Sequence, residues 1–169
     1  MSQVVNAVQR ALRRLQIIVP PVPVREIAES YGIVVREEAA PTDVSGALLR
    51  SQEGVVIVIN SEQHPNRQRF TIAHELGHFL LHEGTPLHVD HDFRVNMRNS
   101  RSSQAVDWEE IEANQFAAEL LMPEGFLKHD LEGAKHSEKD AARLARRYKV
   151  SETAMSYKLV NLGFTPQVD

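Results

Sequence analysis

The chain has 169 residues, of which 42% are hydrophobic and 25% charged, ordinary values for one globular domain that buries a core. Its net charge of -4 argues against a protein built to coat nucleic acid, and the absence of cysteine excludes disulfides and thiolate metal sites. No basic-then-apolar leader and no apolar run of about 20 residues is present, so we expect a cytoplasmic protein without a membrane partner.

The first sixty residues predict two helices followed by strands. An apolar stripe predicts a helix over residues 3–18, and a shorter helix follows over 24–31. Strands are predicted at 33–35, 46–51 and 55–59. The strand at 55–59 is apolar on both faces, so we expect it in the interior of the sheet.

The rest of the chain predicts mainly helices. Pro65 suits the first turn of a helix that runs to about His82, and one edge strand is expected near 88–95. Further helices are predicted at 107–122, 138–148 and 152–162. We therefore expect an α+β fold in which a small, mostly antiparallel sheet is packed with helices. Residues 1–130 are predicted to form one domain and residues 131–169 a C-terminal helical region.

Residues 74–78, His74-Glu75-Leu76-Gly77-His78, form an HExxH motif within the predicted helix at 65–82. Residues four apart share a helix face, so His74 and His78 can grip one metal ion. Glu75 lies one step round the helix, where it can act as the general base of a metalloprotease. Such a string also arises by chance, with histidines that are exposed or hydrogen-bonded in a core. Apolar residues over most of this helix indicate burial, and buried polar groups need partners, which favours a metal site.

A catalytic zinc site usually has three protein ligands, so a third must be found beyond the histidine pair. Gly84 stands where a metzincin would place another histidine, which excludes that class. His82 lies two turns from His74, too far for one ion to reach both. We interpret His82 as a residue that supports the site from outside or lies on the surface.

Glu112 is the best candidate for the third ligand. It is the one carboxylate in a stripe at intervals of four that also contains Trp108, Phe116 and Leu120. A charge in an apolar stripe is costly unless it is paired or bound to a metal. The alternative is an amphipathic surface helix on which this carboxylate pairs with an arginine. Three other glutamates of the helix compete for the role: Glu109, Glu110 and Glu119.

Two blocks of sequence resemble a known family. The run Arg69–His78, followed by Leu80-Leu81-His82, resembles the signature helix of the ImmA/IrrE metallopeptidases, and Glu112–Pro123 closely resembles that family's other signature. The resemblance covers roughly residues 25–162. It implies a zincin-like metallopeptidase domain over 1–130 with a gluzincin-like site.

In that site the resemblance implies zinc on His74, His78 and Glu112, with Glu75 as the catalytic base. Members of the family cleave helix-turn-helix repressors and so release genes of mobile elements or stress responses. The resemblance therefore implies a zinc-dependent endopeptidase whose partner is a protein substrate of that kind.

The segment 141–162 is similar to a helix-turn-helix, with Ser151 as the N-cap of its second helix. Residues 135–158 carry seven Lys or Arg against three Asp or Glu, a net of about four positive charges. A DNA-reading module usually has a stronger basic face, and Lys149 stands where the turn commonly has glycine. We therefore favour a helical pair that packs on the catalytic domain or docks the substrate over direct DNA binding.

Two functions stay open on the sequence alone. The first is the endopeptidase, which needs a donor for the tetrahedral oxyanion; His88, His91 and Tyr157 are candidates by residue type only. The alternative is a non-cleaving, zinc-binding regulatory module that binds a repressor or DNA. Replacement of Glu75 by Gln separates the two, because only the peptidase needs this carboxylate.

Overall fold

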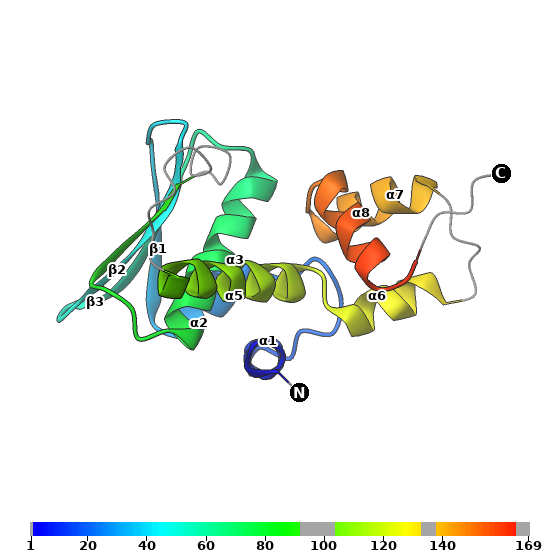
Figure 1. Cartoon of the computed structure of the whole chain (residues 1–169), viewed down its shortest axis with the longest axis horizontal. Coiled ribbons are helices and arrows are strands. Elements are labelled where there is room, and N and C mark those ends of the chain that lie inside the picture. Colours follow the sequence, from blue (N-terminus) through cyan, green and yellow to red (C-terminus); the bar gives the residue numbers. More distant parts are fainter. Residues whose placement is uncertain (1, 92–103, 133–137, 165–169) are drawn as a thin grey trace.

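The computed structural model describes residues 2–91, 104–132 and 138–164 (Figure 1). Its elements, in chain order, are α1 (Gln3–Arg14), α2 (Val24–Ser30), β1 (Ile33–Glu38), β2 (Val44–Ser51), β3 (Gly54–Asn60), α3 (Pro65–Leu81), β4 (Leu87–His91), α5 (Gln104–Leu121), α6 (Glu124–Leu131), α7 (Glu138–Tyr148) and α8 (Glu152–Asn161). The fold is α+β, as the sequence predicts. No helix in these described ranges is long and apolar enough to cross a membrane.

The four strands form one mixed sheet in the order β1-β3-β2-β4. The pairs β2–β3 and β2–β4 are antiparallel and the pair β1–β3 is parallel, so the sheet is mostly antiparallel, as expected. The strand predicted for the interior is β3, which lies between β1 and β2, with Ile57 opposite both Val35 and Leu48. The predicted edge strand is β4, although residues 92–95 of that prediction lie outside the described residues.

Helix α3 packs on the sheet, and α5 packs across α3 (Figure 1). Pro65 begins α3, where its missing N–H costs nothing, and His64 caps the helix by accepting from the Asn66 N–H. Between the sheet and the helices lies the core, whose side chains include Ile27, Leu48, Ile57, Leu76, Phe116 and Leu120. The HExxH motif at residues 74–78 thus lies on the buried part of α3, as the apolar composition of this helix predicts.

Helices α6, α7 and α8 lie together at one end of the molecule, away from the sheet (Figure 1). The predicted cap is present, because the Ser151 hydroxyl accepts from the Ala154 N–H. Lys149 adopts φ 55, the left-handed conformation that explains why glycine is common at this turn. Asn66 and Arg69 of α3 donate to the carbonyls of Val150 and Lys149, which ties the turn to α3. The domain division at 130/131 and the helix-turn-helix assignment stay predictions.

Gly77 allows α5 to approach α3 closely. A Cβ at this position would lie 3.1 Å from Phe116 Cδ1 and 3.2 Å from Ala113 Cα, and one of these is a backbone atom that cannot turn aside. Phe116 and Ala113 are both fully buried, so neither has free space to yield. The glycine in the middle of the motif is therefore a packing requirement between the two helices.

Two helical glycines provide a matched test of this packing. Replacement of a helix glycine by alanine normally stabilises a protein by up to about 1 kcal/mol. Gly125→Ala in α6 should show that gain, because nothing lies within 4 Å of its Cβ position. Gly77→Ala should instead be neutral or destabilising, because overpacking offsets the gain. Chemical denaturation of both variants measures the difference, and equal stabilisation would contradict the close contact.

Candidate metal centre

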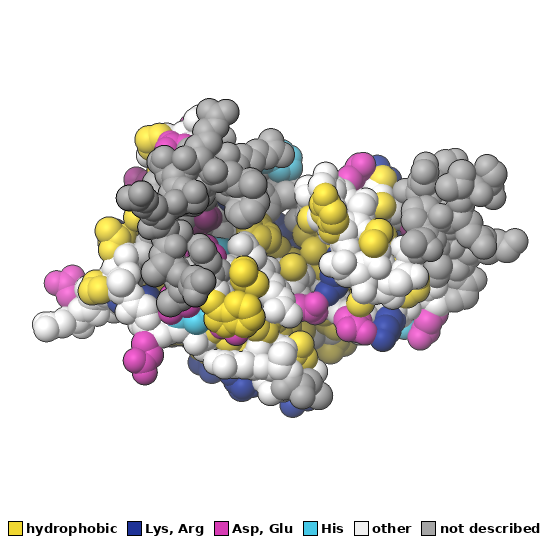
Figure 2. Space-filling view, viewed as in Figure 1, with side chains coloured by type: hydrophobic (Ala, Val, Ile, Leu, Met, Phe, Trp, Pro, Cys, Tyr) yellow, Lys and Arg dark blue, Asp and Glu magenta, His cyan; other side chains and the backbone are white. Residues whose placement is uncertain are grey.

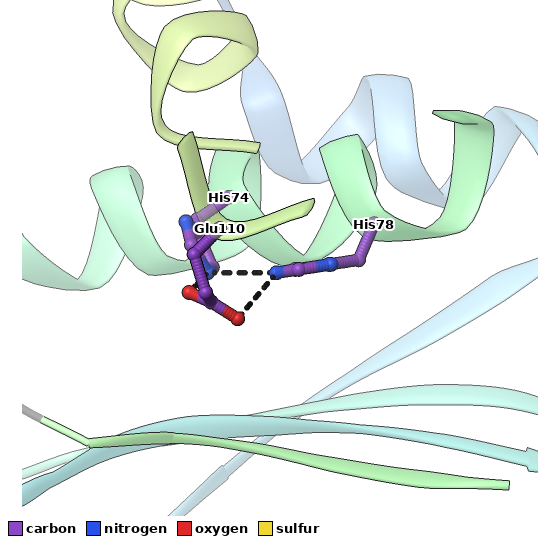
Figure 3. Close-up of side chains that lie close together, drawn as sticks. All are labelled: His74, His78 and Glu110. Carbon is purple, nitrogen blue, oxygen red and sulfur yellow. Dashed lines mark hydrogen bonds and ion pairs between the residues drawn. The ribbon is translucent and has the colours of Figure 1, made fainter. Parts of the chain in front are cut away.

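Three side chains from two helices converge on one point. The Nε2 atoms of His74 and His78 lie 3.1 Å apart, and the Glu110 carboxylate lies 3.4 Å from the first and 3.2 Å from the second (Figure 3). Both histidines are almost fully buried. Two nitrogens that each lie about 2.0–2.1 Å from one tetrahedral zinc ion are roughly 3.3 Å apart. The spacing of these donor atoms therefore fits a metal ion held by His74, His78 and Glu110.

The structure brings Glu110, and not Glu112, to the histidine pair. Residues two apart on a helix project about 200° from each other, so Glu110 and Glu112 do not both reach the histidine pair. Glu112 lies beside His82 instead, with its Oε2 3.1 Å from His82 Nε2. The apolar stripe used to select Glu112 starts at Trp108, which is 62% exposed, and Figure 2 shows hydrophobic side chains exposed over α5. The stripe is therefore exposed at its Trp108 end, although Phe116 and Leu120 further along it are fully buried.

Asn114, which the sequence reasoning did not select, orients His74. The Asn114 Oδ1 lies 3.1 Å from His74 Nδ1, and an amide oxygen can only accept, so Nδ1 carries the proton. The other ring nitrogen of His74, Nε2, faces Glu110 and His78. Glu110 and Asn114 are four residues apart, the same spacing as the two histidines. This second i, i+4 pair was the available signal for Glu110.

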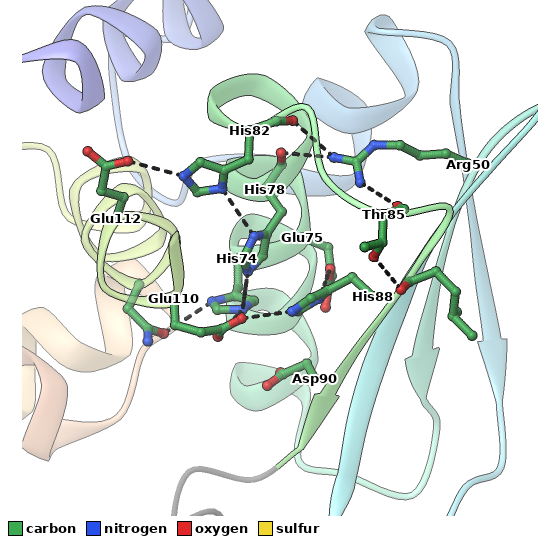
Figure 4. A network of polar contacts seen from close by, with 12 residues as sticks. Arg50, His74, Glu75, His78, His82, Thr85, His88, Asp90, Glu110 and Glu112 are labelled. Carbon is green, nitrogen blue, oxygen red and sulfur yellow. Dashed lines mark hydrogen bonds and ion pairs between the residues drawn. The ribbon is translucent and has the colours of Figure 1, made fainter. Parts of the chain in front are cut away.

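Glu75 is fully buried beside the histidine pair (Figure 4). Its Oε2 lies 3.2 Å from Nδ1 of His88 on β4, whereas its Oε1 has no hydrogen-bond partner among the described residues. His88 Nε2 lies 2.7 Å from the Glu110 carboxylate, so one imidazole joins the predicted base to the third candidate ligand. Among the three histidine and tyrosine candidates named by residue type, His88 is the one that the structure places in the site.

Of the other two candidates, Tyr157 is 69% exposed on α8, and the His91 side chain is outside the described residues.

The charged residues of the site have shifted pKa values. Burial opposes the charged form of His88, but its hydrogen bonds with Glu110 and Glu75 outweigh burial and raise the pKa of His88 to about 10. Burial would raise the pKa of Glu110, but hydrogen bonds with three histidines hold that pKa well below its usual range.

A cavity of about 780 Å³ borders the site between the first half of α3 and the α7–α8 turn. Phe70 lines it and also stacks on the His74 ring, with 6.2 Å between ring centroids. Arg146 and Lys149 line the same cavity, both are exposed, and neither forms an ion pair with another described residue. The carboxylate of Glu152 lines the cavity as well. The C-terminal helices therefore border a partly apolar cavity with two unpaired cations, one side chain away from the candidate metal centre.

A helix that carries HExxH and packs on a second helix that supplies a carboxylate is typical of metalloproteases. Residues 28–160 match the model of the peptidase M78 family, described as the IrrE N-terminal-like domain. Because the match covers most of the chain, the protein belongs to this family, as the two signature blocks predict.

The chain is similar to two proteins named radiation response metalloprotease IrrE. It is 39% identical to that of Deinococcus radiodurans over 114 residues, which are 67% of this chain and 33% of the relative. It is 38% identical to that of Deinococcus deserti over 114 residues, 67% of this chain and 38% of the relative. The chain thus matches only 33% and 38% of the length of these two relatives.

Two further similarities extend over more of the chain. An uncharacterized immunity region protein 2 of Bacillus phage phi105 is 32% identical over 120 residues, which are 70% of this chain and 67% of that protein. A solved structure of a Mycobacterium tuberculosis transcriptional regulator aligns with a TM-score of 0.65 over 94% of this chain and 46% of its own, at 16% identity. At that identity the second likeness shows the fold alone.

His88 should make the stability of the metal-depleted protein depend on pH. Its pKa is about 10 in the folded chain against 6.5 ordinarily, so the stabilisation it provides is complete below pH 6.5 and is lost as pH rises toward 10. Urea denaturation of chelator-treated wild type and His88→Gln should therefore show a stability difference that shrinks from pH 6.5 to 10. A difference that stays constant over this range would contradict the bridged arrangement.

Proposed function

We propose that this protein is a zinc-dependent endopeptidase, with His74, His78 and Glu110 as the metal ligands and Glu75 as the general base. The observation that carries the proposal is the convergence of these two imidazoles and one carboxylate beside a buried glutamate. Membership of a peptidase family, and relatives that are named metalloproteases, support it. Glu110 takes the place in which the sequence favoured Glu112.

The donor set suits zinc. The chain offers no thiolate, and two imidazoles with one carboxylate leave a fourth position of a tetrahedral ion for water, as in catalytic rather than structural sites. Zinc bound there would polarise the scissile carbonyl and lower the pKa of a water molecule to about 7.

The two oxygens of Glu75 have different roles in this proposal. His88 holds Oε2, whereas the unpartnered Oε1 is free to take a proton from the attacking water. The water oxygen forms a bond with the carbonyl carbon, the C–N bond breaks, and Glu75 passes its proton to the leaving nitrogen.

The backbone of the substrate can bind along strand β4. This strand carries His88 and is an edge strand of the sheet, and an extended peptide can pair with such an edge.

We propose a helix-turn-helix repressor as the substrate and hence a cytoplasmic site of action. The family resemblance supports this substrate, and one relative is named as an immunity region protein of a phage. The cavity beside the site, with its apolar lining and unpaired cations, offers a place in which residues next to the cleaved bond can bind. The C-terminal helices would then serve substrate docking rather than DNA binding.

The metal ligands are tested by zinc affinity. Glu110→Gln should weaken binding by at least the 10–100-fold that is typical even of outer-shell residues, and the His74→Ala, His78→Ala double variant should abolish stoichiometric zinc. Glu112→Gln keeps an acceptor oxygen for His82 and should cause a smaller loss than Glu110→Gln. Competition titration with a chromogenic chelator gives the affinities. The reverse order of the two glutamate variants would restore Glu112 as the ligand.

The peptidase is tested by Glu75→Gln, with a repressor encoded beside the gene as substrate. This variant should retain zinc but lose cleavage by about 10²–10⁴-fold, because the general base is removed. Gel analysis of the repressor, with and without zinc, measures the loss. If Glu75→Gln inactivates the repressor as well as wild type does, the non-cleaving regulatory module is the correct account.

A further inference from the structure

Two side chains of α3 join the wall of the cavity to the candidate metal centre. Phe70 lines the cavity and stacks on the His74 ring, with 6.2 Å between the ring centroids. Arg67 also lines the cavity, lies 5.5 Å over the Phe70 ring and reaches Asp90 of β4 at 3.7 Å. Ligand atoms of Asp90, His74 and Glu75 lie within 4.8 Å of one another (Figure 4). A group bound in the cavity therefore lies one side chain away from the proposed chemistry.

Part of the cavity wall is an apolar surface that belongs to the core. Four of the lining side chains are buried hydrophobic residues at the ends of α5 and α7 or directly after them: Leu121, Met122, Ala145 and Val150. The volume of about 780 Å³ is within the roughly 300–1,000 Å³ that is typical of ligand pockets. An apolar side chain that enters the cavity leaves water for this surface, which favours binding.

Two cations line the cavity without a carboxylate partner among the described residues. Their neighbours on α7, Arg143 and Arg147, each form an ion pair with an aspartate, at 2.8 and 3.0 Å. Arg146 and Lys149 are exposed, line the cavity and form no such pair within the part of the chain that the structure describes. The positive charge at this end of α7 that is not matched inside the protein is therefore directed to the cavity.

The other charged groups of the lining do not cancel this charge. Arg67 is paired with Asp90 and adds little. Glu152 supplies one carboxylate, but it is the first residue of α8, where the aligned peptide dipoles favour a negative charge. Two unpaired cations against this one carboxylate leave an excess of positive charge in the cavity.

We propose that this cavity is the specificity pocket of the peptidase, which binds an apolar side chain of the substrate and, beside it, the carboxylate of an Asp or Glu residue. The inference rests on the proposed function and names the chemistry of the sequence that is cleaved. Pockets of this kind combine apolar walls with a few charged groups that provide specificity. Arg146 and Lys149 are those groups here, and they pair with the substrate carboxylate.

The distance to the metal centre limits where this pair of residues lies in the substrate. An extended peptide rises about 3.3 Å per residue. The 6.2 Å between the Phe70 and His74 rings thus corresponds to about two residues. The apolar and acidic residues should therefore lie within about three positions of the cleaved bond.

End-blocked octapeptides with an alanine background provide the test. Each carries one Leu or Phe next to Glu, Gln or Lys, in either order. Fluorescence anisotropy with zinc-loaded Glu75→Gln measures binding without cleavage, and zinc-loaded wild type gives kcat/KM. Peptides with Glu should be preferred over those with Gln by about 5-fold, as for a partly exposed ion pair, and the preference should shrink in about 0.5 M salt. Replacement of Leu or Phe by Ala should weaken binding.

Variants of the pocket assign this preference to its residues. The double variant Arg146→Gln, Lys149→Gln should remove the preference for Glu, and Arg146→Glu with Lys149→Glu should reverse it in favour of Lys. Glu152→Gln should strengthen it, because the carboxylate that opposes the substrate is removed. Arg143→Gln lies on the same helix but outside the cavity and should change nothing. Damage to the turn would instead weaken all peptides alike, and circular dichroism checks that each variant folds.

The outcomes separate the pocket from the proposed function. Equal binding of Glu, Gln and Lys peptides, no binding of any peptide, or a preference that survives Arg146→Gln with Lys149→Gln overturns the pocket. Cleavage without the preference leaves the peptidase without this pocket. If wild type binds the Glu peptides selectively but cleaves neither peptides nor repressor, the proposed function fails and the cavity stands as a peptide-binding site. Should the double variants not fold, the opposite sign expected for Glu152→Gln decides.

Discussion

The close contact between α3 and α5 is the constraint on which the site depends. The first helix supplies the histidine pair and the buried glutamate, and the second supplies Glu110, Glu112 and Asn114. These groups meet only because Gly77 lets α5 lie against α3 at the level of Phe116. Hydrophobic burial along this contact offsets the cost of removing several polar groups from water. The apolar core thus determines the distances between the donor atoms.

Within that contact, each polar group is kept in its place by another. Arg50 satisfies the carbonyls at the end of α3, and His88 reaches from β4 to both Glu75 and Glu110. Because buried polar groups are costly when unpaired, a network of this kind tolerates few alternative arrangements. Glu75 Oε1, the atom that the proposed chemistry uses, is one of four buried side-chain atoms that have no hydrogen bond among the described residues.

The features that sequence predicted well are those that depend on local pattern. The start of α3 at Pro65, the cap at Ser151 and the interior position of β3 follow from proline geometry, side-chain capping and an apolar run. The choice between Glu110 and Glu112 does not. It depends on the rotation of α5 about its own axis, which is set by packing against α3 and not by the residues of α5 alone. The sequence pattern groups the exposed Trp108 with the buried Phe116 and Leu120, because a one-dimensional pattern does not distinguish an exposed aromatic side chain from a buried one.

The turn between α7 and α8 is attached to α3 through backbone carbonyls at Lys149 and Val150. Main-chain acceptors are present whatever the side chain, so this attachment survives substitution on the turn but not loss of Asn66 or Arg69. The exposed Lys149 side chain can therefore diversify, within the residues that accept its left-handed backbone, and change what the neighbouring cavity recognises. In the proposed function, recognition would in this way evolve separately from catalysis, although one helix serves both.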